Sequence, residues 1–189
     1  MRIKHFLLAA GVASVLTSNA WASSYHTDSD DPDECISDWQ AWSSDIKDWY
    51  DILNDGWQNL DGSHEYALDQ FSYAKSHSHT EIYWGQCMKV TTINEDMVDE
   101  MNEGVHRLQR SAECGIEMIQ VMRQREDLAG LIDDYNAGQK VTTELKVALE
   151  YYIRQADKTS GTWACQPEGF WLNFLGDQKS WAHNILGQI

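Results

Sequence analysis

Histidines are the residues of this sequence whose type and spacing point most directly to metal chemistry. His77 and His79 are two positions apart, and His64 and Glu81 lie nearby in the chain. Imidazole nitrogens combined with a carboxylate suit Zn²⁺ or Cu²⁺. Residues two apart on a helix point in different directions, so a shared metal requires this segment to be a loop. The alternative interpretation is a set of exposed loop histidines that bind nothing.

Methionines form a second set with metal-binding potential. Met97 and Met101, and further on Met118 and Met122, are pairs four residues apart in one long helical pattern. Paired thioethers can bind Cu(I), but methionine is also an ordinary core residue. Both pairs lie within or beside the apolar stripe, which favours core packing. We therefore predict no cofactor and keep copper or zinc as the alternative.

Motifs for covalent or acid–base catalysis are missing from the sequence. There is no G-x-S-x-G, no P-loop, no G-x-G-x-x-G and no H-E-x-x-H. Glu65 and Glu81 lie beside histidine and aromatic residues and are the carboxylates to consider for a carbohydrate-active enzyme. The sequence holds 30 acidic residues, so chance pairs of carboxylates are expected. We predict no catalytic residue and favour a protein that is not an enzyme.

Four tryptophans between Asp38 and Leu60 raise the question of sugar binding, because aromatic rings stack on sugars. At about 100° per residue they share one side of a helix with Ile46 and Leu53, which predicts burial. These tryptophans are Trp39, Trp42, Trp49 and Trp57. Tyr83, Trp84 and Trp163 lie near predicted helix ends and are better candidates for exposed aromatic rings.

The opposite side of the same predicted helix is acidic. It carries Asp38, Asp45, Asp48, Asp51 and Asp55. The formal net charge of the chain is −16, which disfavours binding to nucleic acid and anionic membranes and favours basic partners. We therefore predict that these aspartates form a partner-binding surface. The alternative is that the acidity serves solubility only.

The first 22 residues have the features of a secretory signal peptide. Arg2 and Lys4 precede the apolar run FLLAAGVASVL, and Ala20-Trp21-Ala22 fits a cleavage site after Ala22. Cleavage would change the net charge from −16 to −18, because this segment holds two basic residues and no acidic one. The apolar run is shorter than the roughly 20 residues of a membrane span. We predict a periplasmic or secreted protein.

Four cysteines follow the predicted signal peptide: Cys35, Cys87, Cys114 and Cys165. An even number in an exported chain predicts two disulfides, with three pairings open. No C-x-x-C spacing occurs, which disfavours a zinc knuckle or a thioredoxin-type motif.

The apolar periodicity predicts an all-α, disulfide-stabilised bundle of about six helices, with no alternating strand pattern. Residues 23–34 are predicted to be a flexible acidic arm and residues 35–189 a single helical domain. The longest helix is predicted at about Ile93–Arg125, started by a Thr92–Glu95 capping box and followed by a bend near Glu126. Asn54-Asp55-Gly56 resembles a turn that would end the first helix early.

These observations favour an exported acidic helical module that binds another protein. An immunity protein or inhibitor for a basic toxin or cell-wall enzyme would have this charge and location. The alternatives are a periplasmic Cu or Zn binding protein and a carbohydrate-active enzyme.

Overall fold

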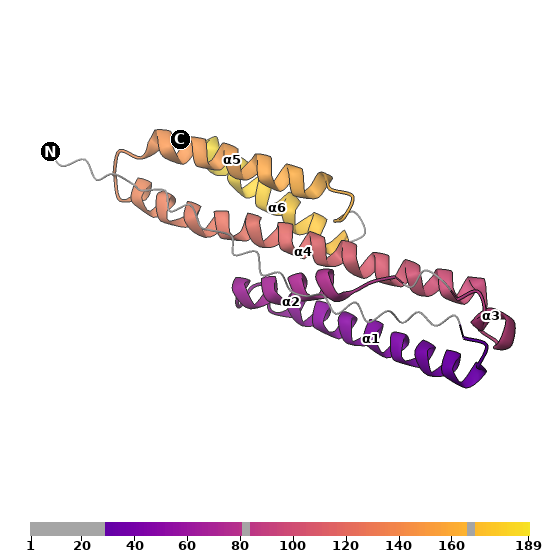
Figure 1. Cartoon of the computed structure of the whole chain (residues 1–189). Coiled ribbons are helices and arrows are strands. Elements are labelled where there is room, and N and C mark those ends of the chain that lie inside the picture. Colours follow the sequence, from indigo (N-terminus) through magenta and orange to yellow (C-terminus); the bar gives the residue numbers. More distant parts are fainter. Residues whose placement is uncertain (1–28, 81–83, 166–168) are drawn as a thin grey trace, which may run out of the picture.

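The computed structural model describes residues 29–80, 84–165 and 169–189 of the 189-residue chain. The predicted signal peptide, most of the predicted acidic arm, Glu81, Tyr83 and the expected helix start at Pro167 lie outside these ranges. The described residues form six helices and no strand, which confirms the all-α prediction (Figure 1).

Helix α1 spans Pro32–Gln58 and begins three residues before the predicted start at Cys35. The Asp31 side chain accepts a hydrogen bond from the Asp33 amide (2.9 Å), and Pro32 occupies the first helical turn. The predicted early end at Asn54-Asp55-Gly56 is wrong, because α1 continues to Gln58. Gly56 is buried inside the helix, where a Cβ atom would lie 2.8 Å from Phe71 Cε1. The glycine therefore serves close packing and not a turn.

Helix α2 spans His64–His77, begins at the N-cap Ser63 and runs back along α1. Its inward face is short and compact: Ala67, Phe71 and Ala74 are buried. The four-residue helix α3, Cys87–Val90, follows and leads into the longest helix.

Helix α4 spans Glu95–Asn136, 42 residues or about 63 Å, and is longer than predicted. The helix is continuous through Glu126, where the sequence predicts a bend. The predicted hydroxyl cap is also wrong, because the N-cap is Asn94, whose side chain accepts a hydrogen bond from the Met97 amide (3.0 Å). The hydroxyl oxygen of Thr91, and not that of Thr92, accepts a hydrogen bond from the Ile93 amide.

Helices α5 (Thr142–Gly161) and α6 (Gly169–Leu186) complete the fold. Gly138 precedes α5 with φ of +79°, a backbone conformation that suits glycine after a helix. Helices α1 and α2 pack on one part of α4, α5 packs on another, and α6 packs on α5 (Figure 1). Both groups flank the middle of α4, where the buried residues are densest: Cys114, Gly115, Met118, Ile119, Val121 and Met122.

Two disulfides link the helical elements of this fold. Cys35–Cys87 joins α1 to α3, and Cys114–Cys165 joins the middle of α4 to the segment after α5. They span 52 and 51 residues, so each contributes about 4 kcal/mol in the chain-entropy model of disulfide stabilisation.

The tryptophans of α1 belong to the core, as predicted. Trp42 and Trp49 are buried, and Trp39 and Trp57 are partly buried against the same cluster. The prediction that Trp84 is exposed is wrong, because Trp84 is only 1% exposed. Its ring centroid lies 5.4 Å from that of Trp39 and 6.0 Å from that of Trp42. Trp39 and Trp42, which are distant from Trp84 in sequence, thus enclose its ring.

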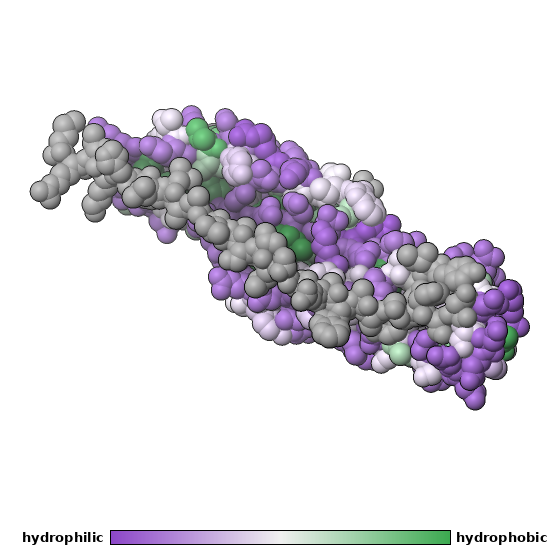
Figure 2. Space-filling view, viewed as in Figure 1, coloured by the Kyte–Doolittle hydropathy of each residue, from purple (hydrophilic) through white to green (hydrophobic). Residues whose placement is uncertain are grey.

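The methionine pairs differ in burial. Met118 and Met122 are buried, whereas Met97 is 37% exposed and Met101 is partly buried. The visible face of the molecule is mainly hydrophilic, with small hydrophobic spots (Figure 2). None of the helices in the described ranges is sufficiently long and apolar to cross a membrane.

Candidate functional site: a groove along α4

The predicted metal residue His64 lies far from His77, another of the predicted ligands. It occupies the first position of α2, whereas His77 occupies the last, about 20 Å along the helix axis. The His64 side chain is mostly buried, and its Nδ1 lies 3.6 Å from Glu126 Oε1 on α4. The structure therefore does not bring His64 together with His77 and His79.

His77 and His79 both use a ring nitrogen for contacts with the backbone. His77 Nδ1 lies 3.0 Å from the Tyr73 carbonyl oxygen, and its ring stacks on Tyr73 at 3.8 Å. His79 Nδ1 lies 3.0 Å from the His77 carbonyl oxygen, and its ring contacts Trp49. The described ranges contain no cluster of three or more residues suited to hold a metal ion. Glu81 lies outside them, so the metal site stays a prediction.

The predicted aspartate face of α1 is only partly open. Asp48 and Asp51 are exposed, and Asp38, Asp45 and Asp55 are half-buried. Burial raises the pKa of Asp45, and the nearby Asp48 charge adds to this effect. The face therefore presents fewer open carboxylates than the sequence pattern suggests.

Two of these aspartates already have partners within the chain. Asp51 pairs with Lys47 at 2.6 Å. Asp55 accepts hydrogen bonds from Asn59 (3.0 Å) and from the Tyr66 hydroxyl, and this bond raises the pKa of Tyr66. Both carboxylates are thus partly committed to local contacts.

A wide hollow lies on α4 and not on the aspartate face of α1. It has a volume of about 690 Å³ and is formed by the first turns of α4 and the segment that leads into α3. We call it the acidic groove. Its described lining residues include no lysine or arginine: Thr80, Trp84, Gly85, Met88, Glu95, Val98, Asp99, Asn102, Glu103 and His106.

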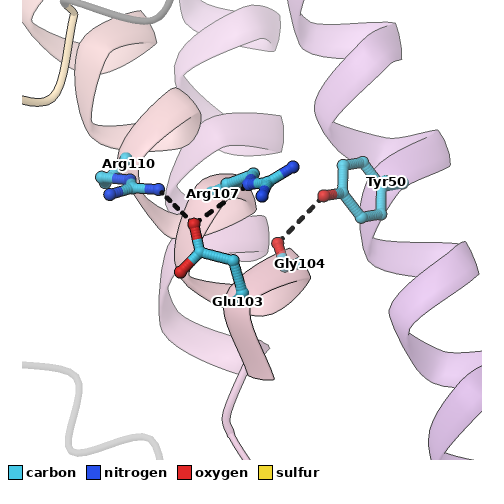
Figure 3. A network of polar contacts seen from close by, with 5 residues as sticks. All are labelled: Tyr50, Glu103, Gly104, Arg107 and Arg110. Carbon is cyan, nitrogen blue, oxygen red and sulfur yellow. Dashed lines mark hydrogen bonds and ion pairs between the residues drawn. The ribbon is translucent and has the colours of Figure 1, made fainter. Parts of the chain in front are cut away.

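Three of the described lining residues of the acidic groove are carboxylates, and they differ in their partners. Glu103 is bonded to Arg107 (3.0 Å) and Arg110 (3.3 Å), as Figure 3 shows, and the hydrogen bond from Arg107 lowers its pKa. Within the described chain, Glu95 and Asp99 have no such hydrogen bond or ion pair. Glu95 and Asp99 are therefore the carboxylates open to a ligand.

The position of Glu103 is set by the packing of α1 on α4. The Tyr50 hydroxyl of α1 donates a hydrogen bond to the Gly104 carbonyl oxygen at 2.9 Å, directly beside Glu103 (Figure 3). Burial raises the pKa of Tyr50, so this hydroxyl stays protonated and able to donate at neutral pH. The contact fixes α1 against the part of α4 that carries the groove.

The buried wall of the acidic groove contains an unsatisfied donor. Trp84 is 1% exposed, and its indole N–H has no hydrogen-bond acceptor among the described residues. A buried donor without an acceptor costs about 1–3 kcal/mol.

A second hollow continues from the first along the same helix. It has a volume of about 310 Å³ and shares His106 with the acidic groove. Its other lining residues are Lys75, Gln109, Arg110, Glu113 and Trp163. A smaller hollow beyond it shares Glu113 and Trp163 and adds Glu117. Together they follow α4 from Glu95 to Glu117, about 33 Å.

Sequence reasoning missed this groove because helical periodicity does not show how the residues around α3 pack against α4. The available signal was a polar stripe on α4 at helical spacing, opposite the methionines: Glu95, Asp99, Glu103, His106, Arg110, Glu113 and Glu117. One part of the prediction is confirmed, because Trp163 is 60% exposed. Glu65 is exposed on the first turn of α2 and lines none of these hollows.

Comparison with known proteins gives no relative: no family model, no curated protein and no solved structure matches the chain.

Proposed function

We propose that this protein binds a basic segment of a partner protein in the acidic groove. Its role would be that of an exported binding module, such as an inhibitor or immunity protein for a basic toxin or cell-wall enzyme. The observation that carries the proposal is the composition of the groove: two open carboxylates, Glu95 and Asp99, beside apolar walls, with no lysine or arginine among the described lining residues.

The groove offers a separate contact for each part of a basic peptide. Glu95 and Asp99 can accept charge-assisted hydrogen bonds from lysine or arginine. Met88 and Val98 can pack against the methylene stems of those side chains. A basic peptide therefore supplies both the cations and the apolar stems that these contacts need, whereas a simple metal cation supplies no apolar surface.

The net charge of the molecule supports the same partner. A formal charge of −16 attracts basic proteins and raises the rate at which they associate, within a Debye length of roughly 8 Å at physiological salt. The exposed Asp48 and Asp51 of α1 add to this field. In this proposal they steer the partner, and the groove on α4 holds it.

The test uses a synthetic peptide of alternating arginine and leucine, with binding measured by calorimetry at low and high salt. Glu95→Gln combined with Asp99→Gln should weaken binding by about tenfold or more and reduce its salt dependence. The matched control is Asp127→Asn with Asp133→Asn, because these two exposed carboxylates lie on the same helix outside the acidic groove. Equal losses in both variants would count against the groove.

A second arm tests the aspartate face of α1. If Asp45→Lys, Asp48→Lys and Asp51→Lys together abolish binding while the groove variant retains it, the binding site moves from α4 to α1. If no variant changes the affinity, a specific site for basic partners is refuted.

A further inference from the structure

Trp163 is exceptional among the tryptophans whose side chains the structure describes, because it exposes its ring. It is 60% exposed, whereas Trp42, Trp49 and Trp84 are buried and Trp39, Trp57 and Trp181 are partly buried. It lies in the segment after α5, over the polar face of α4. An exposed indole in this position has a packing partner on one side and solvent on the other.

Several contacts hold this indole in place. Cys165, two residues later, is bonded to Cys114 in the middle of α4. The Thr162 hydroxyl donates to the Thr159 carbonyl oxygen (2.7 Å), and the Cys165 amide donates to the Thr162 carbonyl oxygen (3.2 Å). The segment is therefore tied both to α4 and to the end of α5. A ring held in this way loses little conformational freedom when a ligand covers it.

One face of the ring is covered by Arg110. The guanidinium carbon lies 5.2 Å from the ring centroid, and the guanidinium is itself bonded to Glu103 at 3.3 Å. Because Arg110 occupies one side, the exposed area belongs to the opposite face and the ring edge. The open face is thus a flat apolar surface, and Arg110 supports the ring on its other face.

The charges around the ring compensate each other. Lys75 pairs with Glu113 at 3.3 Å, and Arg110 pairs with Glu103. An ionic ligand would compete with these pairs, so the cleft selects for a neutral molecule. Donors such as Lys75 and acceptors such as Glu113 lie beside each other, which suits hydroxyl groups, since each hydroxyl both donates and accepts.

We propose that this cleft, lined by Lys75, His106, Gln109, Arg110, Glu113 and Trp163, binds a neutral saccharide. The C–H face of a sugar ring would stack on the open face of Trp163, and its hydroxyls would bond to Lys75 and Glu113. The cleft measures about 310 Å³, which lies at the lower end of the range for small-molecule sites and fits one or two sugar rings. This site is separate from Glu95 and Asp99 of the acidic groove.

The test uses three neutral trisaccharides (chitotriose, cellotriose and maltotriose) and the acidic trigalacturonate as a charged comparison. Binding is followed by calorimetry and by the indole N–H signal of Trp163 in nuclear magnetic resonance spectra. We expect at least one neutral trisaccharide to bind and shift this signal, with an affinity that changes little with salt. Trigalacturonate should bind at least about tenfold more weakly.

Variants then assign the binding to Trp163. Trp163→Ala should reduce the affinity by about tenfold or more, and Trp163→Phe should retain part of it. The control is Tyr151→Ala, which removes a 47% exposed ring of α5 that does not line the cleft. Thermal melting confirms that each variant is folded. The proposal is overturned if no neutral trisaccharide binds, or if Trp163→Ala and Tyr151→Ala bind equally well.

Discussion

The ring of Phe71 on α2 lies directly against the backbone of Gly115 on α4. A Cβ atom at Gly115 would be 2.5 Å from Phe71 Cε2, which is closer than real Cβ contacts allow. The same ring contacts Gly56 of α1, so Phe71 is inserted between two helices at positions where each has no side chain. This insertion brings α1, α2 and α4 into close contact.

Gly115→Ala should destabilise the protein although alanine favours helix formation. The helix-propensity gain of about 1 kcal/mol is outweighed by an overpacking cost of about 1–3 kcal/mol or more. The control is Gly130→Ala on the same helix, where a Cβ meets nothing within 4 Å and the gain should appear alone. Chemical denaturation measures both, and equal stabilities would contradict the packing described.

Asn94→Ala should destabilise α4 by about 1 kcal/mol, because the side chain of Asn94 caps the Met97 amide. Thr92→Ala is the matched comparison and should have a smaller effect, since the Thr92 side chain is exposed and does not cap this helix. The two free energies of unfolding, obtained from urea titrations, should fall in that order. The reverse order would indicate that Thr92, and not Asn94, caps α4.

Tyr152 should make the protein sensitive to alkaline pH. Burial raises the pKa of Tyr152 to about 12, from 10.0, so the folded state favours the protonated phenol. The stabilisation is complete below pH 10 and is lost as the pH rises through about 12. Tyr152→Phe should therefore flatten the dependence of stability on pH in this window.

The neighbouring Tyr151 supplies the control for this effect, because it lies on the same helix and is 47% exposed. Tyr151→Phe should leave the pH dependence unchanged. At neutral pH, Tyr152→Phe should cost about 1 kcal/mol, since the hydroxyl donates to Gln178 Oε1 at 3.2 Å. If both variants follow the wild-type curve, Tyr152 is not the titrating group.

Removing the disulfide Cys114–Cys165 by alanine substitution at both positions should lower stability by about 2–4 kcal/mol. It should also broaden or shift the indole N–H resonance of Trp163, because the segment loses its link to α4. Removal of Cys35–Cys87 should cost a similar amount and leave that resonance unchanged, since this bridge joins α1 to α3. Identical spectra for the two variants would show that the disulfide does not position Trp163.

Periodicity was sufficient to predict the helical fold and the burial of Trp42 and Trp49, because these properties repeat every three to four residues within one segment. The burial of Trp84 was not predictable in this way, since Trp39 and Trp42 enclose it from a helix that is distant in sequence. Gly56 was read as part of a turn for the same reason, because the sequence pattern does not show that Phe71 packs against it.

The candidate sites also differ in whether a local sequence pattern or only the packing of the helices reveals them. Trp163 was predicted to be exposed from its place at a helix end, and this prediction is confirmed. The acidic groove depends on how the segment before α3 lies against α4, and no local pattern encodes that contact. The aspartates of α1 form a regular pattern, but part of their charge is used within the chain, by Lys47 and Tyr66.

The middle of α4 has a consequence for how the chain can be divided. Residues such as Gly115 and Ile119 belong to the one helix on which both groups of helices pack, α1 and α2 on one side and α5 on the other. A fragment that ends at Asn136 would leave the α5-facing surface of this segment uncovered. Despite its elongated outline (Figure 1), the protein should therefore melt in one cooperative transition and resist separation into two autonomous parts.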